Sequence, residues 1–164
     1  MQCRTLPFLI PVLYSTICLG ATPWALSEAT ISGNAGRVEA QLKVTPGELN
    51  QIDKWGWTPL LWSVYYDYLP VTKCLLDHGA DPDVQVAKAY RYVEPGTTPL
   101  IIAARYGLDA QAEALLARGA KLGTADHRGM TAAEYAKKMN FPAVSDLLAK
   151  EKAKANEVSL DPEP

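Results

Sequence analysis

Apolar and polar positions follow a helical period between residues 96 and 120. The segment opens with Thr98-Pro99-Leu100, and a proline in this place is typical of the first turn of a helix. Gly107 follows about two turns later, where its access to the left-handed backbone region can end that helix. A second run, with Ala112 and Leu115 at helical spacing, continues to Gly119. The pattern therefore predicts two short helices joined as a hairpin.

The chain repeats this hairpin at a regular interval. The segment Gly56-Trp57-Thr58-Pro59-Leu60 stands 40 residues before Gly96-Thr97-Thr98-Pro99-Leu100. Downstream, Gly129, Thr131 and Leu148 repeat residues of the same type found 33 positions earlier. A period of 33 residues, lengthened once by seven, with a Thr-Pro-Leu opening resembles the ankyrin repeat. The resemblance covers about residues 28–150.

The resemblance implies an all-α fold, an ankyrin-repeat solenoid of about four stacked helical hairpins. The irregular turn Thr45-Pro46-Gly47 is typical of an end cap, and Glu134 and Lys137 replace apolar residues in the last unit. We expect residues 151–164 to extend the last helix and then, from Asn156, to form a disordered tail. The expected units are residues 28–57, 58–97, 98–130 and 131–150.

One position of the repeat supports this alignment independently. The residue that should end the first helix of each unit is Asn34, Asp67, Gly107 or Asn140. All four belong to the residue types that tolerate a left-handed backbone. The alignment therefore predicts a left-handed turn at the same place in every unit.

The seven additional residues lie between the second and third units, in a loop that spans residues 81–95. Gln85-Val86 and Tyr90-Arg91-Tyr92-Val93 could pair there as a short projecting β-hairpin-like loop. Insertions in solenoids gather on one face, which is often the binding face.

Residues 1–27 differ in composition from the rest of the chain. Arg4 is the only charged residue before Glu28, and an apolar run that includes Leu6 and Leu19 lies between them. Pro23 and small residues follow, as in a secretory signal peptide, and we expect cleavage after Ser27. The alternative is an uncleaved membrane anchor, because the uncharged run is nearly long enough to span a bilayer.

Charge and cysteine content narrow the possible functions. The formal net charge of −2 and the absence of a basic cluster argue against a nucleic-acid-binding protein. Of the three cysteines only Cys74 would remain after cleavage, so no intramolecular disulfide is expected. Cys74 stands four residues before His78 but lacks an orienting partner, so a thiol enzyme is the less favoured hypothesis. Asp81 and Asp83 fit a turn better than a metal site. We therefore expect no catalytic residue, no metal and no cofactor.

The ankyrin resemblance also implies where a partner would bind. In that family partners usually contact the loop tips and the exposed side of the first helix of each unit. Trp, Tyr and Arg, which are enriched at the energetic centres of protein interfaces, occur at these positions here. The residues expected to contact a partner are Lys54, Trp55, Trp57, Tyr65, Tyr66, Tyr90, Arg91, Tyr92, Thr97, Arg105, Tyr106, His127, Arg128, Met130, Lys138 and Met139.

Together these observations predict an exported, non-enzymatic module, most consistent with the bacterial periplasm, that binds another protein. The partner is either a toxic effector, which the module would neutralise, or a resident periplasmic enzyme, which it would assist. The module is expected to be monomeric. A membrane-tethered scaffold with an uncleaved N-terminal segment remains the alternative.

Overall fold

The computed structural model describes residues 24–158, and these residues form helices connected by loops, with no β-strand among them. The signal peptide expected at residues 1–27 lies mostly outside the described residues, as does the end of the expected tail. None of the helices in the described region is long and apolar enough to cross a membrane. The helices are α2 (Ala25–Ile31), α3 (Ala35–Val44), α4 (Pro59–Tyr65), α5 (Leu69–Asp77), α6 (Pro99–Tyr106), α7 (Asp109–Leu116), α8 (Ala132–Lys138) and α9 (Pro142–Val158), with a short 3-10 helix, η1 (Pro46–Glu48).

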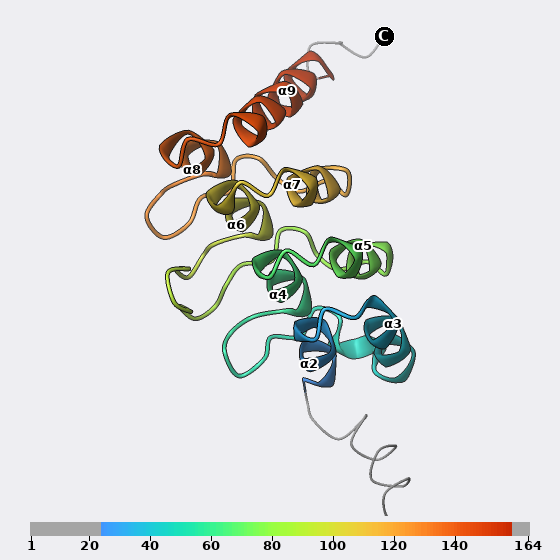
Figure 1. Ribbon diagram of the computed structural model, residues 1–164. Helices are drawn as coiled ribbons and strands as arrows, with labels where there is room; N and C mark the ends of the chain where they lie inside the picture. The colour runs from blue at the N-terminus through green and yellow to red at the C-terminus, as the bar shows by residue number, and fades with distance from the viewer. Residues whose placement is uncertain (1–23, 159–164) are drawn as a thin grey trace, which may run out of the picture.

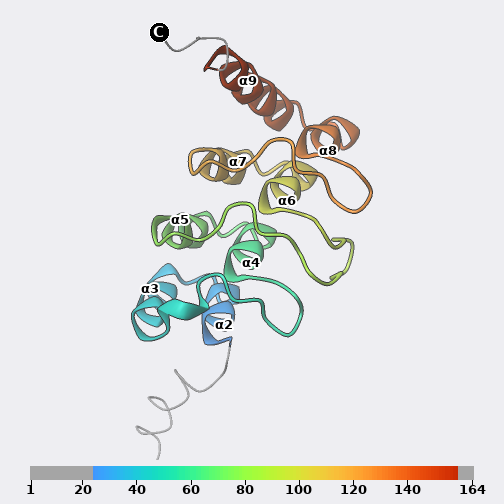
Figure 2. The ribbon, with the colours of Figure 1, turned by 180° about the vertical axis from the view of Figure 1, so that it is seen from behind.

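The helices stack as successive antiparallel pairs (Figure 1). The first helices of the pairs, α2, α4, α6 and α8, contact one another in sequence and form one row. The second helices, α3, α5, α7 and α9, form a parallel row behind them, as the reverse view also shows (Figure 2). Each pair contacts the pair before it and the pair after it, so the described region is an elongated stack.

Local capping explains where the first-row helices begin. Thr58, Thr98 and Thr131 are extended N-cap residues whose hydroxyl groups accept hydrogen bonds from the backbone amide three positions later. A proline follows Thr58 and Thr98 as the first helical residue, as the sequence predicts. Thr131 instead forms a capping box with Glu134, so the glutamate that marks the last unit stabilises its helix.

The left-handed turns that end the first-row helices are confirmed at three of the four expected positions. Asp67, Gly107 and Asn140 have positive φ angles, of 57°, 70° and 60°. In the first pair the prediction of Asn34 is wrong, because Gly33 adopts the left-handed conformation with φ 70°. Asn34 is instead the N-cap of α3 and accepts a hydrogen bond from the Arg37 amide. Helix α2 and its turn are therefore displaced by one residue from the gapless alignment, whereas Val38 and Leu42 of α3 are buried as that alignment expects.

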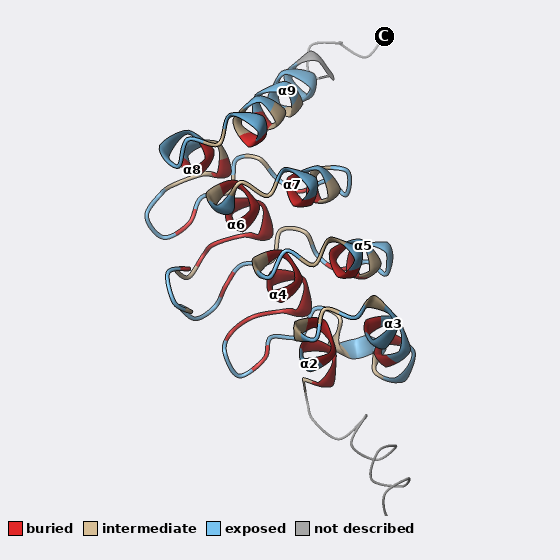
Figure 3. Cartoon of the chain, in the orientation of Figure 1, coloured by how far each residue is buried: buried red, intermediate tan, exposed pale blue. Residues whose placement is uncertain are grey.

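A continuous apolar core runs along the stack. The central first-row helices α4 and α6 are almost entirely buried because each lies between two neighbouring first-row helices and against its own partner helix (Figure 3). Val71 and Leu75 of α5 and Ala112 and Leu115 of α7 complete this core from the second row. Small residues such as Ala103, which has no exposed surface, allow the helices to approach closely.

The first pair includes residues that the sequence analysis assigned to the signal peptide. Helix α2 begins at Ala25, and the side chain of Leu26 has 0% of its surface exposed. The Leu26 amide also donates a hydrogen bond of 2.8 Å to the Glu48 carboxylate. Cleavage after Ser27 would remove the first turn of this helix together with its buried leucine. Residues 25–27 are therefore packed as part of the described fold, and the cleavage position stays a prediction.

The loop of residues 81–95 is not the β-hairpin that the sequence suggests. Tyr90 and Val93 form a single antiparallel bridge around a tight turn, in which Arg91 has a φ angle of 51°. Val86 and Val93 are buried, and the Val86 backbone forms hydrogen bonds with Gly96 and Thr97. Buried Val86 and Val93 therefore hold the loop against the stack, while its tip with Tyr92 projects into solvent (Figure 1). At the other end, α9 continues to Val158, beyond the expected start of the tail at Asn156.

Two buried aspartates each anchor one connecting loop to the helix that follows it. Asp53 accepts hydrogen bonds from the Trp55 and Trp57 amides and, at 2.6 Å, from the indole N–H of Trp62. Asp126 occupies the equivalent place two pairs later. It accepts from the Arg128 and Met130 amides and, at 2.6 Å, from the Tyr135 hydroxyl.

The hydrogen bonds of Asp126 affect its ionisation. Burial raises the pKa of this carboxyl group, but hydrogen bonds from the Tyr135 hydroxyl and from the Met130 and Arg128 amides favour the charged form. These bonds outweigh burial, so the pKa of Asp126 is below its usual value. The resulting stabilisation is complete above about pH 4, the pKa of an unfolded aspartate, and is lost as the pH falls through the lower pKa of the folded state.

The first prediction concerns the start of the domain. Replacing Leu26 by alanine should lower the free energy of unfolding by about 2–5 kcal/mol, because the change leaves a cavity between α2 and its neighbours. Val44→Ala, at an exposed site on α3, is the matched control and should change stability by no more than about 0.5 kcal/mol. Urea unfolding of the two variants measures the difference. Equal, small effects would show that α2 is not part of the core.

The second prediction concerns the buried carboxylate. Tyr135→Phe removes the hydroxyl donor to Asp126 and should cost about 1.5–3 kcal/mol of unfolding free energy at neutral pH. The cost should shrink as the pH falls below about 4, the pKa of an unfolded aspartate, and then through the lower pKa of Asp126 in the folded state, because the carboxylate becomes protonated. Tyr92→Phe, at an exposed ring, should have no effect at any pH. A cost for Tyr135→Phe that is the same at both ends of the pH range would contradict the role assigned to the charged form of Asp126.

Candidate binding surface

The loops that connect one pair to the next all project on the side of the first-row helices (Figure 1). Neighbouring loops are in contact with one another. The Trp57 indole N–H donates to the Lys88 carbonyl at 3.3 Å, and Arg128 of the third loop forms an ion pair with Glu94 of the second. Position 96 requires a glycine, because a Cβ atom there would lie 2.8 Å from the His127 ring. The loops therefore form a continuous surface.

An aromatic cluster lies where the first two of these loops meet α4 and α6. We define it as Trp55, Trp57, Trp62, Tyr65, Tyr66, Tyr68, Tyr90 and Tyr106. The Trp62 ring is central: it stacks on Trp57 with centroids 4.6 Å apart and on Tyr66 at 5.8 Å. Tyr65 extends the cluster to the next pair, with its ring 6.0 Å from that of Tyr106. Edge-to-face and stacked contacts of this kind stabilise a fixed arrangement of rings.

Most of the aromatic residues predicted to meet a partner are accessible. Trp55 is 37% exposed, Tyr66 and Tyr106 are exposed to a similar degree, and Tyr92 at the tip of the second loop is 76% exposed. Tyr65 and Tyr90 are half-buried within the cluster. Burial raises the pKa of Tyr65, and the nearby Tyr106 raises it further, so the Tyr65 hydroxyl remains protonated at neutral pH.

Trp57 is an exception among the residues expected to contact a partner, because it is buried. Its side chain has 0% of its surface exposed, because it stacks on Trp62 and its indole N–H is bonded to the Lys88 carbonyl. Thr97 is also buried, and Met130 is half-buried against the core. Loop position alone suggested that these residues were accessible. The sequence does not show that the longer second loop folds over Trp57.

Cationic side chains lie over several of the rings. The Lys54 ammonium group is 4.2 Å from the centroid of Trp55 and 5.6 Å from that of Trp24. The Arg105 guanidinium is 5.5 Å from the Tyr135 centroid and 6.0 Å from that of Tyr106. Arg91 approaches Tyr90 at 5.8 Å. Such contacts orient the cations and keep them at the surface.

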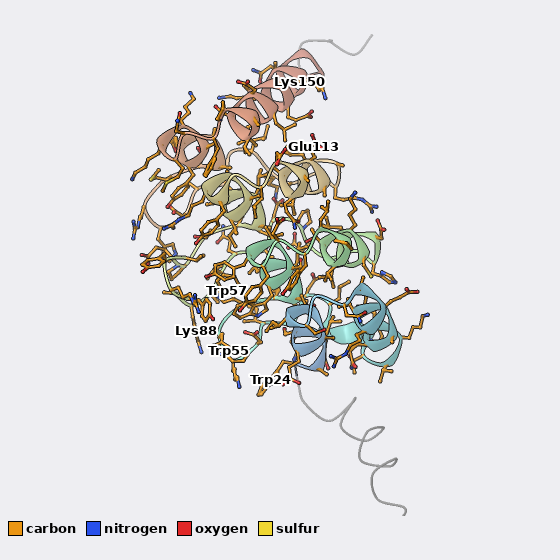
Figure 4. The ribbon with its side chains drawn as sticks, in the orientation of Figure 1. Trp24, Trp55, Trp57, Lys88, Glu113 and Lys150 are labelled. Carbon is orange, nitrogen blue, oxygen red and sulfur yellow. The ribbon has the colours of Figure 1, made fainter. Side chains whose placement is uncertain are left out.

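Two residues at this surface were not in the predicted set. Lys88 lies beside Trp55 on the loop side of the stack, as Figure 4 shows. Trp24 lies near the same edge and was assigned to the signal peptide. The interval of 40 residues marks the second loop as an insertion. That signal could have pointed to Lys88, which lies in this loop. His127, Arg128, Lys138 and Met139 are exposed on the last loop and on the end of α8, as predicted.

The other candidate chemical groups have structural roles. Burial raises the pKa of the Cys74 thiol, as do the nearby Glu39 and Asp77, so the reactive thiolate is disfavoured. The Cys74 sulfur lies 4.0 Å from His78 Nδ1, which also lies 2.8 Å from the Cys74 carbonyl oxygen. Asp81 and Asp83 form the predicted turn, and Asp83 accepts a hydrogen bond from the Lys121 amide of the next pair. Residues 24–158 contain no cluster of side chains able to hold a metal ion.

Comparison with known protein families finds one segment of the chain that matches a family. Residues 55–86 match the ankyrin repeat family, and this segment covers the end of the first loop, α4, α5 and the start of the second loop. A search of curated proteins found no match. Ankyrin repeats generally mediate protein–protein interaction and are typically not enzymes. The similarity is therefore shown for residues 55–86, which have the length and sequence pattern of one ankyrin repeat.

Proposed function

We propose that the four helix pairs are ankyrin-type units of one solenoid and that the chain binds another protein without catalysing a reaction. The contact surface is the exposed part of the aromatic cluster together with Tyr92, Lys54, Arg91 and Arg105. The observation that carries the proposal is the group of solvent-exposed rings, Trp55, Tyr66, Tyr92 and Tyr106, on the loop side. Large exposed aromatic groups on a folded domain are typical of interaction sites.

The packing of the cluster suits it to binding. Its outer rings rest on Trp57 and Trp62, which are buried, and Asp53 fixes both the Trp62 indole and the adjoining loop. A surface held in this way loses little conformational entropy when a partner binds. Trp, Tyr and Arg at such a surface can each contribute about 2 kcal/mol or more to binding.

The sequence of residues 1–23 supports export, most simply to a bacterial periplasm. Because Leu26 is buried in the folded domain, we place the cleavage site before Trp24 rather than after Ser27. In that compartment the chain would either neutralise a toxic effector or assist a resident enzyme. A scaffold tethered through an uncleaved N-terminal segment is the alternative. A thiol enzyme that uses Cys74 is disfavoured by the raised pKa of that thiol.

A pull-down with the exported protein tests the function. Trp55→Ala combined with Tyr92→Ala removes two exposed rings and should weaken partner capture by about thirtyfold or more. Val44→Ala, on an exposed part of α3, should capture the partner as the unmodified protein does. A toxin as partner favours the inhibitor role, and a host enzyme favours the helper role. Full capture by the double variant, with unchanged thermal stability, would exclude this surface as the binding site.

The intact mass of the exported protein tests localisation and processing. We expect a mature chain that begins at or before Trp24, because α2 must be complete to pack against α3 and α4. A chain that begins at Glu28 would contradict this boundary. A full-length chain recovered with the membrane fraction would support the tethered alternative instead.

A further inference from the structure

On the loop side of the stack four cationic side chains lack an ion-pair partner within the described part of the chain, whereas the acidic side chains accept hydrogen bonds or form ion pairs. Lys54, Lys88, Arg91 and Arg105 form no ion pair with any of residues 24–158, as far as the structure describes the chain. The first three are exposed on loops, and Arg105 is half-exposed on α6. They surround the aromatic cluster, since Lys54, Arg91 and Arg105 each lie over one of its rings.

The acidic side chains of the same loops are already bonded within the chain. Asp53 and Asp126 accept the anchoring hydrogen bonds described above, and Glu94 is paired with Arg128. Glu48 accepts from the Leu26 amide, and the Asp81–Asp83 turn is closed by hydrogen bonds. These carboxylates keep their negative charge, but among residues 24–158 none of them forms an ion pair with the four cations.

The second row of helices also carries cations that form no ion pair within residues 24–158, such as Arg37 of α3 and Lys73 of α5. Its ion pairs join residues within one helix or between neighbouring pairs, as in Lys43 with Glu39 and Arg118 with Asp77. The loop-side cations differ in their surroundings, because Lys54, Arg91 and Arg105 each lie over a ring of the aromatic cluster. Exposed cations without an ion pair attract ligand groups of the opposite sign.

The cations that lie over these rings can still bind a carboxylate. A guanidinium group that lies over an aromatic face keeps its N–H donors free at the edge, where they can form bidentate hydrogen bonds with a carboxylate. Arg105 is placed in this way over Tyr106 and Tyr135. Tyr106 and Tyr66 lie at the same surface and offer apolar contact area with a hydroxyl donor.

We propose that the partner presents an acidic segment, in which Asp or Glu side chains stand next to an apolar or aromatic residue. The carboxylates contact Lys54, Lys88, Arg91 and Arg105, and the apolar residue rests on Tyr66 and Tyr106. This inference depends on the protein-binding function proposed above and adds the chemistry of the partner.

The same contacts disfavour a nucleic acid, which would also be anionic. Proteins that bind single strands offer open ring faces on which bases stack. Here the exposed Tyr66 ring stacks on both Trp62 and Tyr68, and Lys54 lies over Trp55. The rings therefore support side-chain contacts better than base stacking.

A random dodecapeptide library displayed on phage, selected on the full-length protein, tests the inference. The enriched peptides should contain Asp and Glu next to apolar residues, and their binding should weaken as salt is raised. Arg91→Ala combined with Arg105→Ala should weaken the binding of an enriched peptide by about tenfold or more. Arg37→Ala combined with Lys43→Ala removes the same charge from exposed positions on α3 and should leave binding unchanged.

Three outcomes would overturn the inference. They are enrichment of neutral or basic peptides or of none, equal binding by the two double variants, and tighter binding of a single-stranded oligothymidine or an anionic vesicle than of the best peptide. If the Trp55→Ala and Tyr92→Ala variant loses its natural partner while the Arg91→Ala and Arg105→Ala variant keeps it, the binding function stands and only the acidic chemistry is wrong.

Discussion

The structure depends on the burial of each first-row helix between its neighbours. A single pair of short helices cannot enclose its own apolar residues, because a two-helix unit has no second layer to cover them. Helices α4 and α6 resolve this by contacting α2, α8 and each other as well as their own partners. Close approach requires small residues such as Ala103 and Ala104 and left-handed turns such as that at Gly107, where a Cβ atom would meet Phe141 at 2.5 Å. The stack therefore restricts both side-chain size and backbone conformation.

The loop surface follows from this packing and from the buried aspartates. Asp53 and Asp126 hold their loops against the next first-row helix by bonding both loop amides and an aromatic side chain. The middle loop lacks such an aspartate, since buried Val93 occupies the corresponding place. Its seven additional residues instead cover Trp57 and present Tyr92 to solvent. Two kinds of loop anchoring thus produce one surface that carries both rings and cations.

Much of the helical organisation could be predicted from repeat spacing, because Thr-Pro openings and left-handed stops depend on local chemistry. Burial of individual aromatic residues could not, since Trp55 and Trp57 flank the same glycine and only contact with the neighbouring loop separates them. Helix α2 was displaced by one residue because Asn34 caps α3 and the left-handed turn falls on Gly33, while Val38 and Leu42 of α3 stay in register. Its start was hidden because buried Leu26 and the apolar residues before it have the same hydrophobic character.

The one-dimensional stacking also determines where local opening occurs. Among residues 24–158 the first and last pairs contact one neighbouring pair each, so amide hydrogen exchange should be fastest in α2, α3, α8 and α9 and slowest in α4 and α6. The ring contact between Tyr65 and Tyr106 joins α4 to α6, the two most protected helices. The centre of the aromatic cluster therefore lies on the part of the chain that unfolds last, and fraying at either end leaves it intact.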